Sequence, residues 1–127
     1  MGTWGSGNFE NDRAADYVGD IIKQLGATIE DCLADEDRAA LDEDGEAVLM
    51  PSVNLIAVIC EHCRVAAPAV DAVQRWRDSY LRIFDEQVDG LDPAPEFKQE
   101  RRQVIADTFA RLEQYAQWFW GDDPPAQ

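Results

Sequence analysis

The chain has 127 residues, of which 26 are Asp or Glu and 11 are Lys or Arg, so its formal net charge at pH 7 is −15. This length fits one domain, and a hydrophobic content of 46% is typical of a globular protein rather than a disordered one. The lack of basic residues argues against direct nucleic-acid binding and adhesion to anionic membranes, since both need Lys and Arg against phosphate groups.

The first nine residues carry three glycines around Trp4 and are expected to form a compact turn rather than a helix. A helix should begin directly after this turn, because Asn11 and Asp12 are both good N-cap residues. Phe9 precedes them, at a position from which an apolar side chain packs against the first turn of a helix. We expect Trp4 to be buried against the bundle, so that Trp4→Ala costs on the order of 3 kcal/mol.

The first helix is amphipathic, with apolar residues at every third or fourth position from Ala14 to Leu25. Gly26 can end it, and Thr28 followed by Asp31 resembles the capping box of a second, short helix. The apolar spacing also continues through Gly26, so a single kinked helix stays open as the alternative.

An acidic stretch from Asp35 to Glu46 follows and is expected to be a solvated turn. Its run Asp42-Glu43-Asp44-Gly45 resembles part of a calcium-binding loop, which needs a carboxylate at its first position and a Glu at its twelfth. With Gly45 at the sixth position, those places fall to Ala40 and Pro51. The stretch therefore does not predict a calcium site.

Three more helices are expected, at about 51–66, 69–89 and 95–119. The first of these is apolar over most of its circumference, which predicts a place in the middle of the bundle. No segment shows the alternation of period two that is typical of strands. The sequence thus predicts an all-α fold, a single bundle of four to five helices over residues 1–120 with the glycine-rich turn packed on it, followed by a flexible tail at 121–127.

The string Cys60-Glu61-His62-Cys63 is the one that most resembles a metal site, since two cysteines with this spacing often supply half of the four ligands of zinc. On a helix, however, Cys60 and Cys63 lie about 60° apart, while His62 points about 100° away from Cys63. We interpret both cysteines, in the middle of the predicted helix, as small buried core residues. No metal and no cofactor is expected, and elemental analysis should find no stoichiometric zinc.

Three cysteines are too few and too odd in number for a disulfide framework, and the N-terminus lacks the basic and apolar regions of a signal peptide. No apolar run reaches the length of a membrane span. We therefore expect a cytoplasmic protein. Its single histidine and its lack of nucleophile or phosphate-binding motifs make an enzyme the less favoured class.

Two arginines fall on the apolar stripes of their helices. Arg77 belongs to the helix expected at 69–89, and Arg101 belongs to the helix expected at 95–119. A charge in such a place must pair with a carboxylate or extend to solvent, and the alternative is a pocket for an anionic ligand. Trp118, on the flank of the last apolar stripe, could face solvent or a partner, or could pack on Trp4 and the opening turn. We expect at least one of the two arginines to be paired, and we favour the packing of Trp118 on the turn.

The most specific pattern in the chain is its opening, Met1-Gly2-Thr3-Trp4-Gly5-Ser6-Gly7-Asn8-Phe9-Glu10-Asn11-Asp12-Arg13-Ala14-Ala15-Asp16-Tyr17. It resembles the start of the bacterial family called domain of unknown function 4259, whose members typically begin Met-Gly-x-Trp-Gly-x-Gly-x-Phe-Glu-Asn-Asp. The resemblance implies a small bacterial helical protein and supplies no activity. Because some members look to be encoded near toxin systems, it also implies an immunity-type role as a hypothesis.

The opening pattern has a structural and a functional interpretation. Asp16 lies off the apolar side of the first helix and could accept backbone N–H groups from the glycine turn, which would make the pattern a device that holds the fold. Alternatively, Glu10, Asp12 and Asp16 could surround a ligand site.

The sequence favours a non-enzymatic protein-binding module that acts through an acidic helical surface, with a basic protein as the expected partner. An immunity protein that masks a basic toxin is the most concrete version, and the oligomeric state is left open. The alternative is a small enzyme or ligand-binding domain that uses acidic residues near Arg77 or Arg101. The candidate binding residues are Glu10, Asp12, Asp16, Arg77, Arg101 and Trp118.

Overall fold

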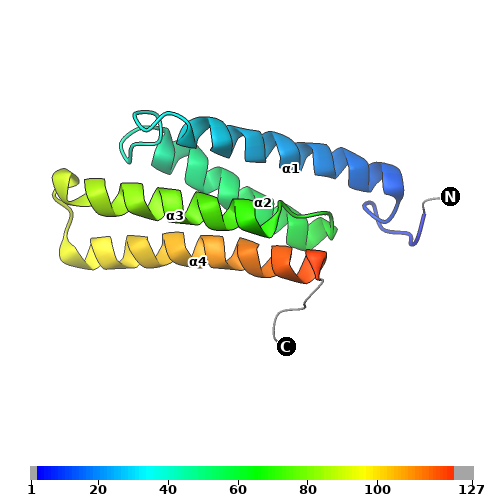
Figure 1. The fold of residues 1–127 in the computed structure, drawn as a ribbon. Helices are drawn as coiled ribbons and strands as arrows, with labels where there is room; N and C mark the ends of the chain where they lie inside the picture. The colour runs from blue at the N-terminus through cyan, green and yellow to red at the C-terminus, as the bar shows by residue number, and fades with distance from the viewer. Residues whose placement is uncertain (1–2, 122–127) are drawn as a thin grey trace.

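The computed structural model describes residues 3–121, which form four long helices and two short helical segments (Figure 1). In chain order these are α1 (Asp12–Leu33), the π-helical segment η1 (Gly45–Leu49), α2 (Met50–Cys63), α3 (Val70–Gln87), the 3-10 segment η2 (Val88–Leu91) and α4 (Pro95–Trp120). Successive long helices run in opposite directions (Figure 1), but α3 lies diagonally across the bundle from α2 and packs on α4 and, less closely, on α1. The predicted all-α fold is confirmed. Apart from Gly121, the predicted flexible tail lies outside the described residues.

The first helical region is one continuous helix, so the predicted second helix after Gly26 was wrong and the single-helix alternative was the correct one. Gly26 is buried within α1 beneath the ring of Trp76, where an added Cβ would lie 3.6 Å from Trp76 Cη2. The hydroxyl of Thr28 donates to the carbonyl oxygen of Gln24, within the same helix, rather than capping a new one. A glycine can remain inside a helix when tertiary packing outweighs its poor propensity, and here a tryptophan covers it.

The core is formed by the inward sides of all four helices, with Tyr80, Phe84 and Phe109 among its largest fully buried side chains. α2 packs against both α1 and α4, and α4 packs against α3, whereas α1 and α3 make few contacts. The main polar link between α1 and α3 is Glu30, which accepts two hydrogen bonds from Arg75 and one from the indole N–H of Trp76. The helix α1 is therefore held chiefly by α2.

The predicted central place of α2 was wrong, because one of its sides faces solvent. Ile56, Ala57 and Cys60 are completely buried, but Leu55 is 50% and Val58 is 44% exposed. Two neighbouring helices cover only part of the circumference of a third, so an apolar surface is left uncovered. The helical stretch Gly45–Cys63 is also long and apolar enough to cross a membrane by length and composition alone, a test that the core helix of a soluble protein can pass as well.

The ends of α2 also differ from prediction. The helix stops at Cys63, earlier than expected, because Arg64 takes a left-handed conformation with φ 58° and ψ 43°. Cys60 and Cys63 thus lie in its last turn rather than in mid-helix. At the other end, helical structure begins at Gly45, inside the stretch predicted to be a solvated turn. Gly45 has no room for a side chain, since a Cβ there would collide with the carbonyl oxygen of Ala39.

Candidate functional site

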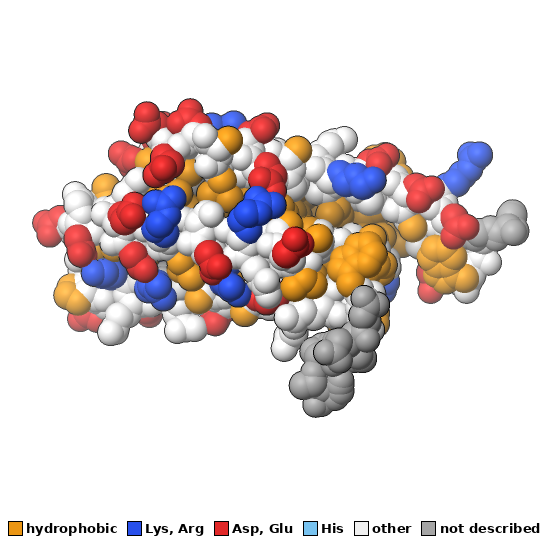
Figure 2. All heavy atoms as spheres, in the orientation of Figure 1, with side chains coloured by type: hydrophobic (Ala, Val, Ile, Leu, Met, Phe, Trp, Pro, Cys, Tyr) orange, Lys and Arg blue, Asp and Glu red, His pale blue; other side chains and the backbone are white. Residues whose placement is uncertain are grey.

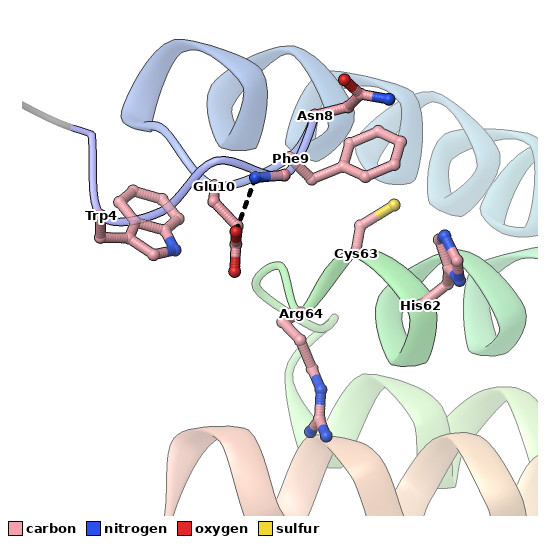
Figure 3. Close-up of a pocket in the computed structure, with 8 residues that line it drawn as sticks. Trp4, Asn8, Phe9, Glu10, His62, Cys63 and Arg64 are labelled. Carbon is pink, nitrogen blue, oxygen red and sulfur yellow. Dashed lines mark hydrogen bonds between the residues drawn. The ribbon is translucent and has the colours of Figure 1, made fainter.

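The opening segment folds around the carboxylate of Glu10 (Figure 3). The Gly7 N–H donates to Glu10 Oε1 at 2.7 Å, and the Trp4 N–H donates to the Glu10 carbonyl oxygen at 3.0 Å. A Cβ on Gly7 would lie 2.8 Å from Glu10 Oε1, and a Cβ on Gly5 would collide with the same atom. A side chain at either glycine would therefore push the exposed carboxylate of Glu10 out of its place in the turn.

Asn11 is the residue that caps α1. Its side-chain oxygen accepts a hydrogen bond from the Ala14 N–H at 2.8 Å, while Asp12 is the first residue of the helix. The expected contact of Asp16 with the glycine turn is not made: the Gly7 N–H is bound by Glu10, and Asp16 is exposed on α1. Of the acidic residues in the opening pattern, Glu10 thus shapes the turn, and Asp12 and Asp16 face solvent.

The predicted burial of Trp4 was wrong, since its side chain is 58% exposed. The residue of the turn that packs is Phe9, which is half-buried and meets the ring of His62 edge-on with a centroid distance of 5.9 Å. Between the turn and the end of α2 lies a cleft of about 440 Å³, with Trp4 and Glu10 on one wall and Arg64 on the other (Figure 3).

Trp118 is half-exposed near the same end of the bundle. Its ring lies 5.6 Å from that of Tyr115, and the guanidinium carbon of Arg64 lies 5.3 Å from its ring centroid. This contact is a cation–π interaction. Trp118 thus packs on Tyr115 and Arg64 rather than on Trp4, contrary to the packing that we favoured.

Arg77 and Arg101 both form ion pairs, which confirms the expectation that at least one of them would. Arg77 lies 2.7 Å from Glu113 and 2.9 Å from Asp78, and the hydrogen bond to Asp78 is the main cause that raises the pKa of Arg77. Arg101 Nε lies 2.7 Å from Glu46 Oε1, although the angle between them is unsuited to a hydrogen bond. Both guanidinium groups therefore have carboxylates beside them.

Glu46 has a second role, because it also binds the only polar atom of a completely buried tyrosine. The hydroxyl of Tyr80 donates to Glu46 Oε2 at 2.8 Å, and the ring of Tyr80 has no exposed surface. Burial is the first cause that raises the pKa of Tyr80 well above its ordinary value, and the hydrogen bond to Glu46 is the second. Glu46 thus joins η1, which leads into α2, to α3 and, through Arg101, to α4.

The cysteines are protonated thiols at neutral pH. Burial raises the pKa of Cys60 to about 12 and also raises the pKa values of Cys32 and Cys63. Zinc binding and redox chemistry need thiolates, which burial disfavours. Within residues 3–121 no three His, Cys, Asp or Glu side chains are grouped so that they could hold a metal ion. The expected absence of zinc from the purified protein stays a prediction.

Acidic side chains gather on one side of the molecule, and most of them have no cationic partner within the described residues, Glu30, Glu36 and Asp44 being the paired ones. Residues 10–44 contain twelve acidic and three basic residues, a net charge of −9 out of −15. Four exposed aspartates form a stripe along the side of α1 opposite its buried residues, with the exposed Arg13 and Lys23 among them, and the loop at 34–44 continues the acidic surface beyond the end of the helix (Figure 2). We call this surface the acidic side; its exposed acids are Asp12, Asp16, Asp20, Asp31, Asp35, Glu36, Asp37, Asp42 and Glu43.

The acidic side also exposes an aromatic ring, because Tyr17 lies on α1 beside Asp16 and is 70% exposed. Along α3, in contrast, acidic and basic side chains alternate (Figure 2). Asp12 and Asp16 were candidate binding residues from the sequence, whereas Asp20 and Asp31 were not. The spacing of four residues from Asp12 to Asp16 to Asp20 was the available signal for a stripe.

A second surface, between α2 and α4, is almost uncharged. A groove of about 510 Å³ runs between the two helices, with Arg101 and its partner Glu46 in its wall. We call this surface the α2–α4 face; its side chains are Pro51, Asn54, Leu55, Val58, Phe97 and Val104. This surface was not predicted from the sequence, because a helix in the middle of the bundle would have had no exposed side.

A family model described as Domain of unknown function (DUF4259) matches residues 2–118. The resemblance of the opening residues therefore extends over nearly the whole chain. A comparison with curated proteins and one with solved structures each found no match. The chain belongs to the DUF4259 family.

Proposed function

This member of the DUF4259 family is, we propose, a non-enzymatic cytoplasmic protein that binds a basic protein through its acidic side. The observation that carries the proposal is the uneven pairing of its carboxylates. Within residues 3–121, no Lys or Arg forms an ion pair with Asp12, Asp16, Asp20 or Asp31 of α1. Of the twelve acids between residues 45 and 121, seven form an ion pair: Glu46, Glu61, Asp78, Asp85, Glu86, Asp89 and Glu113.

Unpaired carboxylates on one side give the molecule a directed electrostatic field. Such a field attracts a basic protein, speeds its association and makes the affinity fall as salt is added. The exposed ring of Tyr17 supports the same assignment, since aromatic residues are enriched in protein interfaces. In this proposal Asp12 and Asp16 contact the partner directly, and Glu10 holds the turn beside them.

The other candidate residues fit this function less well. The alternative of an enzyme or ligand site near Arg77 or Arg101 loses support, because carboxylates of the protein itself already neutralise both guanidinium groups. Trp118 stays a candidate contact at the end of the bundle, where it is half-exposed. The most concrete version of the proposal is an immunity-type protein that masks a basic toxin.

The test is capture of the partner with matched baits, followed by measurement of the affinity of the purified pair. One bait carries Asp16→Asn, Asp20→Asn and Asp31→Asn on α1, and the control bait carries Glu96→Gln, Glu100→Gln and Asp107→Asn on α4. We expect a basic partner that the first bait binds at least about tenfold more weakly than wild type, with little change for the control. We also expect the Kd to rise between about 50 and 300 mM NaCl.

Two results would count against the function. A captured protein that is not basic, or whose Kd does not depend on salt, is inconsistent with electrostatic recognition. Equal weakening by the two baits would mean that net charge, rather than the acidic side, governs binding.

A further inference from the structure

The α2–α4 face is an apolar surface that nothing within the described bundle covers. Leu55 and Val58 form the outward ridge of α2, and Phe97 and Val104 lie across the groove on α4, each about half-exposed. Single exposed apolar side chains are common on monomeric proteins, whereas a contiguous group of large ones marks an interface.

The charges of α2 and of the groove wall are paired within the protein. Glu61 is the only Asp, Glu, Lys or Arg between Met50 and Cys63, and it accepts hydrogen bonds from Arg111 Nε at 2.9 and 3.0 Å. Glu46, at the edge of the groove, has Arg101 beside it. In a chain with a net charge of −15, the groove and the outward side of α2 are therefore close to neutral, and Glu100 on α4, beside Val104, is the exposed acid at the edge of the face that the described residues leave without an ion pair.

We propose that the α2–α4 face is the interface of a homodimer, in which a second copy of this chain covers it. The net charge of the chain indicates that the molecule covering this face is a second copy rather than a basic protein. Two copies that carry −15 each repel one another, and the repulsion is least when the neutral faces meet and the acidic sides point apart. A basic protein, in contrast, is drawn to the acidic side and gains no charge pairing on the α2–α4 face.

The face also suits pairing with itself. A two-fold axis brings the same residues of both copies together, and it is the commonest symmetry of soluble homo-oligomers. With α2 of one copy antiparallel to α2 of the other, Leu55 and Val58 of each would lie against the corresponding ridge of its partner. The arrangement leaves both acidic sides free, so the dimer is independent of the proposed function and would offer it two binding sites.

The test is sedimentation velocity of the full chain between about 1 and 200 µM, at low and at high NaCl. We expect a dimer whose Kd falls as salt is raised from about 20 to 500 mM, because screening weakens the repulsion between the two acidic copies. This dependence on salt has the opposite sign to that expected for a basic partner, so the two proposals can fail separately.

Matched variants locate the interface. Val58→Glu should raise the dimer Kd at least about thirtyfold, because it places a charge in an apolar contact. Tyr17→Glu adds the same charge at an exposed apolar position on the acidic side and should leave the Kd within about threefold of wild type. Leu55→Gln, which adds no charge, serves as a second interface variant, and thermal melts verify that each variant is folded.

A wild-type protein that remains monomeric at every concentration and salt level would overturn the proposal and leave the face to a different protein. A dimer that neither Val58→Glu nor Leu55→Gln weakens would overturn it as well. So would a dimer that Tyr17→Glu dissociates, since its interface would then lie on the acidic side.

Discussion

The acidic side and the α2–α4 face belong to the same bundle, but their carboxylates differ in whether they form ion pairs. On the α2–α4 face, Glu46 and Glu61 each lie against an arginine of α4. On the acidic side, Asp16 and Asp20 face solvent, and the structure gives them no ion pair. The net charge of −15 is therefore largely a property of one side of the molecule. Where the charges are placed, rather than their sum, indicates which surface attracts which partner.

The largest effect on stability is expected when the removal of a paired carboxylate is compared with the removal of an unpaired one. Glu46→Ala should lower the free energy of unfolding by about 2 kcal/mol, because the buried Tyr80 hydroxyl loses its acceptor and Arg101 its counterion. Asp16→Ala should change it by less than about 0.5 kcal/mol. Urea denaturation measures both values. Similar costs for the two variants would contradict the distinction between paired and unpaired acids.

The pH dependence of stability offers a second test. Hydrogen bonds from Arg111 are the main cause that lowers the pKa of Glu61 below its ordinary value of 4.5, and arginines lower the pKa values of Glu30 and Asp85 in the same way. A carboxylate whose pKa is lower in the folded than in the unfolded state stabilises the fold above its unfolded pKa. That contribution is lost as the pH falls through the folded value.

We therefore expect these pairs to hold the melting temperature up near neutral pH and to lose their effect below about pH 4.5. The melting temperature of Glu61→Gln should be lower than that of wild type at pH 7 and should fall less on acidification. Asp16→Asn, which removes a carboxylate outside any ion pair, is the control. Its melting temperature should fall on acidification by the same amount as that of wild type. An unchanged drop in Glu61→Gln would show that the pair with Arg111 contributes no stability.

The third test separates the residues of the opening turn that hold the fold from those that are free to bind. Asn11→Ala should cost about 1 kcal/mol, since it removes the cap of α1, while Asp12→Ala should cost much less. Trp4→Ala should also cost no more than about 1 kcal/mol, because the ring is 58% exposed. Thermal or chemical unfolding of the three variants measures these costs. A loss near 3 kcal/mol for Trp4→Ala would make the turn part of the core.

The smallest expected effect concerns repulsion within the acidic side. The α1 bait with Asp16→Asn, Asp20→Asn and Asp31→Asn should melt roughly 1–3 °C above wild type at low salt, because it relieves repulsion among like charges. The difference should disappear at about 500 mM NaCl. A melting temperature that is the same as that of wild type at low salt would mean that these aspartates lie too far apart to repel.

The sequence predicts features of this bundle that depend on local spacing. The amphipathic period from Ala14 to Leu25 identified a helix, and an arginine on an apolar stripe required a counterion, which the structure supplies for both Arg77 and Arg101. The counterions themselves, Glu113 and Glu46, lie far along the chain on other helices. No local pattern could name them.

The errors arose where the answer depends on the placement of one element against another. A helical wheel shows how wide an apolar surface is, but not which part of it the neighbouring helices cover, so the exposure of Leu55 and Val58 was missed. Trp4 was expected to be buried because the opening pattern was interpreted as a turn packed on the bundle that holds the fold. The turn instead lies beside the last residues of α2, and Phe9 rather than Trp4 makes the contact.

The sparse packing between α1 and α3 has a consequence for local unfolding. Since α1 is held mainly by α2, it should open as a unit at a lower free energy than the rest of the bundle, and its amide protons should exchange with solvent as a block before those of α3 and α4. The same helix carries the aspartate stripe. A basic partner bound there would slow exchange in this block most of all, because opening α1 would then also require release of the partner.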